Sequence, residues 1–277
     1  MDLKLKDRLN FYIEFKDWYY KISNDFGFNY QKESESRDYL ANILQKKVNK
    51  YNLETILKDF QTMVENKSYI LIYGCGPSLE STVDNLVNHI GIRLFSEFLN
   101  FTADGASILL RERGLPINCI FSDLDGITVK EFNITDFIVI HAHGDNIDKI
   151  KLFEPEILKF HNVIGTTQIE PSNNIINPGG FTDGDRILYF LRPLIKPMQK
   201  LFLIGMDFQN IIGKYSKLDI NADQEGSLMK KKKLRYAMEL IKWLKKKMIN
   251  DIYFVISNSI SEKFTHLSIR DFINIIK

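Results

Sequence analysis

The chain has 277 residues, 44% of them hydrophobic, which is enough for one large domain or for one domain with a helical appendage. Lys and Arg total 37 and Asp and Glu total 35, so the net charge of +2 lacks the basic excess that marks nucleic-acid-binding proteins. The two cysteines, Cys75 and Cys119, are far apart and indicate neither a disulfide framework nor a zinc site. The charged N-terminus has no apolar signal core, and no apolar run approaches the roughly 18 residues of a membrane span, so we expect a cytoplasmic protein.

Residues 1–66 are expected to form a helical region. Aromatic and aliphatic side chains recur there at the spacing of one helix face, in the sets Phe11, Phe15, Trp18, Tyr19 and Ile56, Phe60, Met63. Charged residues fill the other faces, and Gly27 marks a break. We expect this stripe to pack against the rest of the protein rather than to bind a ligand.

Residues 67–277 are expected to form an α/β domain with a mostly parallel sheet flanked by helices. Apolar runs of strand length that end in Gly, Asp or Ser predict strands buried on both faces, at 69–73, 99–103, 117–121, 137–141, 162–164, 201–204 and 252–256. Helical patterns fall between several of these runs, at about 79–96, 105–113, 147–159, 183–192 and 227–248.

Conspicuous residues follow the ends of the predicted strands, and they are Gly74, Asp104, Asp123, Asp145 and Asp207. Ligands of doubly wound sheets bind outside the carboxyl ends of the strands. The clustering of these residues at strand ends therefore predicts an active site at that edge of the sheet.

The run Gly74-Cys75-Gly76-Pro77-Ser78-Leu79 joins a strand to a helix. Its glycines allow a tight turn, and its helix N-terminus favours an anion, so we expect Gly74, Gly76, Pro77 and Ser78 to bind phosphate. The alternative is a glycine turn and a capped helix that hold no ligand.

Carboxylates dominate the next three strand ends. Asp123 and Asp125 in Ser-Asp-Leu-Asp-Gly would repel each other unless a cation lay between them, and Asp145 is expected to join them around Mg²⁺. The alternative for the pair is a solvated Asx turn. Asp104 in Ala-Asp-Gly-Ala is expected to orient a substrate, although a helix N-cap is the commoner use of such an Asp.

Two histidines, His141 and His143, precede Asp145 without a third strong zinc ligand nearby. They are expected either to face phosphate groups or to be positioned core imidazoles. A last group of candidates for substrate binding is Thr166, Thr167, Gln168, Gly180, Asp183, Asp185 and Asp207, with the guanidinium of Arg186 suited to phosphate. One of Asp183 and Asp185 is alternatively a helix-capping residue. The run Lys230–Lys233 favours a solvated helix face over a polyphosphate contact.

Seven of these motifs, taken in order, resemble one known family. They are Gly-x-Gly-Pro-Ser-Leu, Ala-Asp-Gly-Ala, Asp-Leu-Asp-Gly, His-Ala-His-Gly-Asp-Asn, Thr-Thr-Gln, Gly-Gly-Phe-Thr-Asp-Gly-Asp-Arg and Gly-Met-Asp-Phe, between residues 74 and 208. The order resembles that of archaeal-type 6-hydroxymethyl-7,8-dihydropterin pyrophosphokinases, the MptE-like family. The Ala-Asp-Gly and Asp-x-Asp steps are also similar to thiamine pyrophosphokinases.

The resemblance implies an enzyme that transfers diphosphate from ATP to the hydroxymethyl group of the pterin and releases AMP, on a route to folate or methanopterin cofactors. It implies Mg²⁺ held by Asp123, Asp125 and Asp145, and catalytic roles for Asp104, Asp125, Asp145 and Arg186. ATP and the pterin would then be the partners, with no nucleic acid or membrane, and a homo-oligomer is left open. Three alternatives remain at this point. They are a nucleotide-sugar-dependent glycosyltransferase related to flagellin-glycosylation proteins, a thiamine pyrophosphokinase-like enzyme, and a module that senses nucleotides without turnover.

Overall fold

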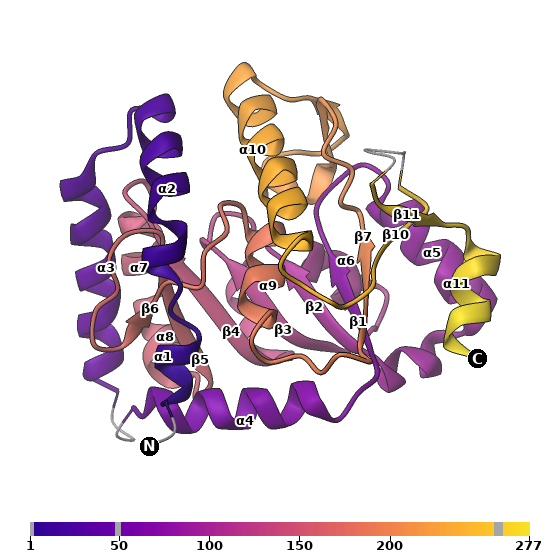
Figure 1. Cartoon of the computed structure of the whole chain (residues 1–277), viewed down its shortest axis with the longest axis horizontal. Coiled ribbons are helices and arrows are strands. Elements are labelled where there is room, and N and C mark those ends of the chain that lie inside the picture. Colours follow the sequence, from indigo (N-terminus) through magenta and orange to yellow (C-terminus); the bar gives the residue numbers. More distant parts are fainter. Residues whose placement is uncertain (1–2, 48–50, 258–262) are drawn as a thin grey trace.

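A computed structural model describes residues 3–47, 51–257 and 263–277 (Figure 1). Its centre is a sheet of nine strands in the order β11-β10-β7-β1-β2-β3-β4-β5-β6, in which every neighbouring pair is parallel. The strands are β1 (Tyr69–Tyr73), β2 (Leu99–Ala103), β3 (Ile117–Ser122), β4 (Thr135–Ala142), β5 (Val163–Thr167), β6 (Ile175–Ile176), β7 (Lys200–Ile204), β10 (Ile252–Val255) and β11 (Thr265–Leu267). The predicted parallel α/β fold is confirmed.

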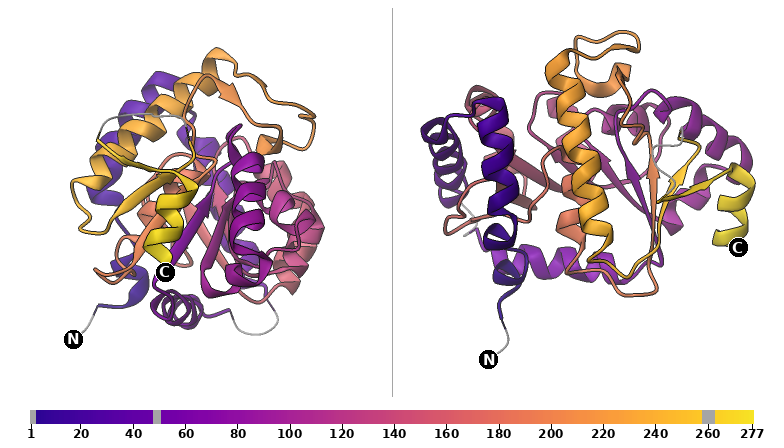
Figure 2. Two further views of the ribbon diagram at one scale, coloured as in Figure 1. Left: turned by 90° about the vertical axis from the view of Figure 1, so that its right-hand side faces the viewer. Right: turned by 45° about the horizontal axis from the view of Figure 1, so that its top comes forward.

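Helices cover both faces of this sheet, which is why the strands are apolar along their whole length (Figure 2). One face packs against α1 (Leu5–Arg8), α2 (Tyr12–Phe26), α4 (Leu53–Glu65), α9 (Asp183–Leu191) and α10 (Leu228–Lys245). The other face packs against α3 (Tyr30–Gln45), α5 (Leu79–Ile90), α6 (Ala106–Glu112), α7 (Ile147–Leu152), α8 (Glu154–Lys159) and α11 (Ile269–Ile276).

Two expected helices are interrupted. The pattern over 79–96 forms α5 only as far as Ile90, because Gly91 adopts a positive φ of 73°, and a 3₁₀ helix, η1 (Ile92–Glu97), follows. The pattern over 147–159 divides at Phe153 into α7 and α8, and Pro155 lies in the first turn of α8. Proline fits that first turn because its missing N–H would have no intrahelical partner there.

Several short elements were not predicted. They are β6, β11, α11, the hairpin strands β8 (Ile211–Ile212) and β9 (Gln224–Glu225), and the 3₁₀ helices η2 (Val129–Asn133) and η3 (Lys214–Ser216). Most are too short to show a periodic pattern, and only tertiary pairing defines them. The segment between β7 and α10, which carries β8, η3 and β9, passes over the upper end of the sheet in Figure 1.

The expected N-terminal helical region is helical at α1 to α4, apart from residues 1–2 and 48–50, which lie outside the described part of the chain. Its side chains share one core with the sheet: the ring of Phe60 contacts Phe101 on β2, Phe137 on β4 and Phe190 on α9. The division into regions 1–66 and 67–277 stays a prediction. Within the described residues, no helix combines the length and the apolar character needed to cross a membrane.

Candidate active site

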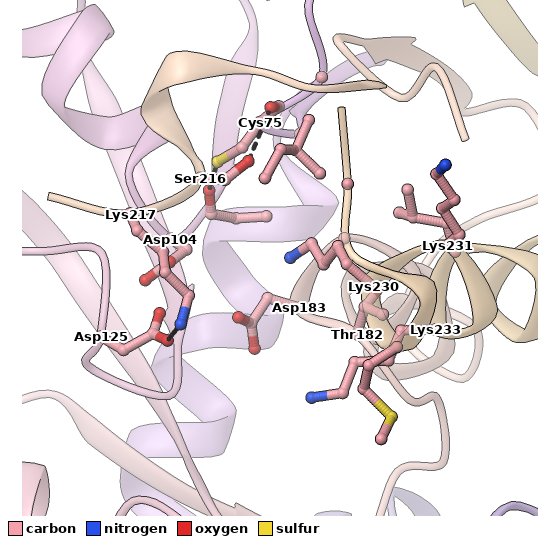
Figure 3. A pocket seen from close by; sticks show the side chains of 18 of the residues that line it. Cys75, Asp104, Asp125, Thr182, Asp183, Ser216, Lys217, Lys230, Lys231 and Lys233 are labelled. Atoms are coloured by element: carbon pink, nitrogen blue, oxygen red, sulfur yellow. Dashed lines mark hydrogen bonds and ion pairs between the residues drawn. The ribbon is translucent and has the colours of Figure 1, made fainter. Parts of the chain in front are cut away.

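A cavity of about 840 Å³ lies at the carboxyl ends of the parallel strands. Its floor comes from the turns after β1, β2, β3, β4 and β7, and one wall comes from the start of α9. The rest of the lining comes from the segment between β7 and α10 and from the first turns of α10, which carry Lys230, Lys231 and Lys233 (Figure 3). The predicted location of the site at the strand ends therefore coincides with the cavity.

Three carboxylates meet on one side of this cavity. Oxygen atoms of Asp104, Asp123 and Asp125 all lie within 4.8 Å of one another. Asp104 follows β2 in the left-handed region, with φ at 48°, and its Oδ1 accepts hydrogen bonds from Ser122 Oγ at 2.6 Å and from the Gly126 amide at 3.1 Å. The sequence predicted Asp123 and Asp125 as a pair; the addition of Asp104 depends on this turn.

The negative charges of these carboxylates repel one another. Burial, followed by the charges of Asp123, Asp183 and Asp125, holds the pKa of Asp104 well above its usual range. Burial and the charge of Asp123 raise the pKa of Asp183 to about 7. Lys217 offsets part of the repulsion with an ion pair to Asp125, Nζ to Oδ2 at 3.2 Å. A divalent cation would relieve the rest, so the donor set fits Mg²⁺.

His143 binds one member of this group. Its Nδ1 accepts a hydrogen bond from the Asp145 amide at 3.3 Å, so its Nε2 is the nitrogen that donates to Asp123 Oδ2, at 3.2 Å. Burial raises the pKa of Asp123, but the hydrogen bond and charge of His143 and the hydrogen bonds from Asp125 together outweigh burial, so the pKa lies below its usual range. Asp145 lines the cavity but is exposed and lies outside the group of three carboxylates.

Arg186 and His141 form a buried polar chain behind the cluster. Nη2 of Arg186 donates to His141 Nε2 at 3.0 Å and to the Phe181 carbonyl at 3.1 Å, while Nη1 donates to Asp183 Oδ1 at 3.2 Å. His141 therefore carries its proton on Nδ1 and donates it to Thr166 Oγ1 at 3.1 Å. Thr166 is a buried partner of this chain and is not part of the cavity lining.

Asp185 has a different position from its neighbour Asp183. Its carboxylate accepts from the amides of Phe181 at 2.8 Å and Thr182 at 2.6 Å and from Thr182 Oγ1, which caps α9. Gly180, with φ at 85°, packs so closely that a Cβ would lie 2.7 Å from Arg186 Cα. Both residues support the start of α9, and neither is among the residues that line the cavity.

The glycine turn after β1 packs against the turn after β7. The amides of Gly74 and Gly76 donate to the carbonyls of Ile204 and Gly205, at 2.8 and 2.7 Å. The amide and hydroxyl of Ser78 both donate to Asp207 Oδ2 at 2.9 Å. Gly74, Gly76 and Asp207 line the cavity, whereas Pro77 and Ser78 are outside its lining.

The remaining candidates lie near β5. Gln168 lines the cavity, and its Nε2 donates to Glu33 Oε2 on α3 at 3.0 Å. Thr167 is buried beside it, and its Oγ1 accepts a hydrogen bond from the Ile169 amide at 3.4 Å. The structure thus connects the Thr-Thr-Gln motif to the N-terminal helices.

The lysines of the cavity were not predicted as site residues. Lys230 and Lys233 on α10 line it, and Figure 3 shows their side chains on the side opposite Asp125. The neighbouring Lys232 turns away and pairs with Asp25 Oδ1 at 2.7 Å. Lys217 lies in an irregular segment, where no periodic pattern marks it. The apolar periodicity that predicted a helix at 227–248 placed Lys230–Lys233 on that helix but did not show which of the lysines face a ligand.

Comparisons with known proteins agree with this geometry. The model of the 6-hydroxymethylpterin diphosphokinase MptE-like family matches residues 41–213, which span the carboxylate cluster and the glycine turns. The chain belongs to the MptE-like family. A 6-hydroxymethyl-7,8-dihydropterin pyrophosphokinase of Methanocaldococcus jannaschii is 39% identical over 249 residues, covering 85% of this chain and 98% of that protein.

Two further relatives carry the same description. The protein of Pyrococcus furiosus is 32% identical over 84% of this chain and 93% of its own length. The protein of Methanothermobacter thermautotrophicus is 33% identical over 83% of this chain and 93% of its own length. The MptE-like match ends before α10, so Lys230 and Lys233 lie beyond the region matched by the family model.

Proposed function

We propose that this chain is a 6-hydroxymethyl-7,8-dihydropterin pyrophosphokinase. It transfers a diphosphate from ATP to the hydroxymethyl group of the pterin and releases AMP. The observation that carries this proposal is the distribution of charge in one cavity. The carboxylates of Asp104, Asp123 and Asp125 lie on one side, and the lysines Lys230 and Lys233 lie on the other. Membership of the MptE-like family supports the choice of substrate.

The carboxylate cluster is the proposed Mg²⁺ site. Asp104, Asp123 and Asp125 would hold the ion, which supplies charge neutralisation on the phosphates when bound. Asp145, which we predicted as a third ligand, is near enough to the cavity to act through bound water or substrate. Asp104 takes a metal-binding role here in place of the substrate-orienting role expected from the sequence.

The triphosphate of ATP is proposed to lie between this cluster and α10. The first turn of α10 contains no acidic residue, and it carries Lys230 and Lys231 where the helix dipole disfavours cations. A bound polyphosphate offsets this unfavourable arrangement because its negative charge interacts with the lysines and with the helix N-terminus. Arg186, which also lines the cavity, adds a buried positive charge.

The pterin ring is proposed to occupy the apolar part of the cavity, which Phe28, Phe181, Met206 and Phe208 line. Asp207 also lines the cavity, and its Oδ1 is buried without a hydrogen-bond partner among the described residues. That oxygen can accept hydrogen bonds from the amidine edge of the heterocycle.

In the transfer, the hydroxymethyl oxygen bonds to the β-phosphorus of ATP, and the bond from that phosphorus to the oxygen bridging it to the α-phosphorus breaks. AMP leaves with the electron pair of this bond. Asp183, with a pKa raised to about 7, is suited to accept the hydroxyl proton near neutral pH. Positioning and charge neutralisation supply the remainder of the catalysis.

The product would feed the synthesis of folate or tetrahydromethanopterin-type cofactors in the cytoplasm. The deciding experiment measures AMP release from ATP with and without the pterin and with and without Mg²⁺. We expect AMP only when both are present. AMP formed without the pterin, diphosphate transfer to thiamine instead, or consumption of a nucleotide sugar would each overturn the proposal.

A further inference from the structure

The first part of helix α3, residues 30–40, lies before the region that the family model matches, which begins at residue 41, and it contacts a residue that lines the cavity, Gln168. Two buried polar side chains on its first turns meet the turn after β4: Glu33 lies beside Gly144, and Ser36 bonds to Asn146. This turn carries His143, the partner of Asp123. The N-terminal helices therefore contact the site through defined hydrogen bonds as well as through the apolar core.

Glu33 holds the middle of this turn. Its side chain is only 2% exposed, and Oε2 accepts a hydrogen bond from Gln168 Nε2 at 3.0 Å. The other oxygen lies beside Gly144, where an added Cβ would be 3.2 Å from Oε1 and 3.1 Å from the Cβ of Lys32. A buried carboxylate is costly unless such partners satisfy it, so its presence indicates a positional requirement.

Ser36 holds the end of the turn through Asn146. Ser36 Oγ donates to Asn146 Oδ1 at 3.0 Å, and the same oxygen accepts the His143 amide at 3.0 Å. Asn146 Nδ2 donates to the carbonyls of His141 at 2.6 Å and Asp123 at 2.9 Å. Every hydrogen-bonding position of this buried amide is used, so one side chain joins α3, the His143 turn and the Asp123 turn.

We propose that Glu33 and Ser36 are positioning residues of the active site, which fix the turn 141–146 so that His143 meets Asp123. The proposal rests on the proposed function only for its Mg²⁺ readout. Neither residue contacts the proposed metal or phosphate, and both act through Gly144, Gln168 and Asn146.

The test uses Glu33→Gln and Ser36→Ala, with Ser36→Thr as the conservative variant. A glutamine at position 33 has one acceptor oxygen, so it cannot serve both Gln168 and the Gly144 side of the turn. Alanine at position 36 leaves Asn146 Oδ1 with one donor fewer. Glu35→Gln is the matched control, because Glu35 is exposed on the same helix and, among the described residues, its side chain bonds only to Gln31 within that helix.

The first readout is amide hydrogen exchange of residues 143–146 in the substrate-free protein, which requires no enzymatic activity. We expect faster exchange there in Glu33→Gln and Ser36→Ala, unchanged exchange in the strands, and recovery in Ser36→Thr. The second readout is Mg²⁺ titration by calorimetry. Residues that orient metal ligands typically change affinity by about 10-fold or more, so we expect the Kd to rise by that factor.

A purely structural role predicts a different result. Loss of folded protein lowers the number of binding sites while leaving the Kd of the folded fraction unchanged, and it accelerates exchange throughout the chain. That result, or wild-type exchange at 143–146 in both variants, would overturn the proposal. If AMP release fails in the wild type, the proposed function fails, whereas exchange and Mg²⁺ affinity still decide the role of α3.

Discussion

The guanidinium of Arg186 donates a hydrogen bond from Nη2 to Nε2 of His141, 3.0 Å away, and both side chains are almost completely buried. Arginine has no acceptor atom, so this ring nitrogen of His141 must be unprotonated. Burial and the positive charge of Arg186 hold the pKa of His141 well below its usual range. The buried cation thus requires a neutral imidazole beside it.

His141 should make the protein less stable in mild acid. In the unfolded chain it takes up a proton below its ordinary pKa of 6.5, whereas the folded protein keeps it neutral. Its contribution to stability is therefore present above that pH and is lost as the pH falls toward the folded pKa. Urea unfolding should show a steeper loss between pH 6.5 and about pH 5 in the wild type than in His141→Gln, by at most about 1.4 kcal/mol per pH unit. Parallel profiles for the two proteins would contradict this account.

Mg²⁺ should stabilise the protein through the carboxylate cluster. At about 100 times its Kd, a ligand that binds only the folded state adds about 2.7 kcal/mol. We expect Mg²⁺ to raise the Tm of the wild type and to leave that of Asp125→Asn nearly unchanged, and turnover of this variant should be lost. Asp148→Asn is the control, because Asp148 is exposed and its one ion pair within the described residues is with Lys151. An equal Mg²⁺ response in Asp125→Asn and the wild type would exclude Asp125 as a ligand.

Lys230 and Lys233 should contribute to ATP binding, since their side chains line the cavity opposite the carboxylates. Each alanine variant is expected to raise the KM for ATP by about 10-fold, the equivalent of ~1.4 kcal/mol, with a smaller effect on the KM for the pterin. Steady-state kinetics with each substrate varied in turn measures this difference. Lys232→Ala supplies the control, because Lys232 pairs with Asp25. Equal KM values for ATP in all three variants would show that Lys230 and Lys233 do not contact ATP.

Asp183 should impose a stability cost that grows with pH. Burial and Asp123 raise its pKa from 3.8 to about 7, so the folded protein binds a proton between these values that the unfolded chain does not. Stability therefore falls as the pH rises through this window. Asp183→Asn should be more stable than the wild type by a margin that is larger at about pH 8 than at about pH 4, and its turnover should fall at least about 100-fold. Chemical denaturation at both pH values measures the margin, and a pH-independent margin would contradict the assignment.

The sequence predicted the main strands and the edge of the sheet where the site lies. Strands buried on both faces are apolar throughout, and the chain becomes polar at once where they end, as at Asp123 after β3. Asp123 and Asp125 could be grouped because they are close in sequence. The presence of Asp104 in the same group could not be predicted, because it depends on a left-handed turn after a different strand.

Glu33 illustrates the part that local patterns could not predict. The run Gln31-Lys-Glu-Ser-Glu-Ser-Arg is typical of a solvated helix face, and Glu35 is indeed exposed. Glu33 is buried because of where α3 docks on the turn after β4, which is tertiary information. Lys217 likewise pairs with Asp125 from an irregular segment, in which no periodic pattern shows where its side chain lies.

The contact between Gly76 and Asp207 makes two distant motifs inseparable for protein engineering. A Cβ on Gly76 would lie 2.3 Å from Asp207 Oδ2, the oxygen that holds Ser78 from 129 residues away in the sequence. The same Cβ would lie 2.6 Å from the backbone carbonyl oxygen of Gly205, so a shorter side chain at position 207 does not by itself make room for a larger residue at 76. Grafting this site onto another scaffold requires transferring both turns as one unit, in the register that the adjacent strands β1 and β7 impose.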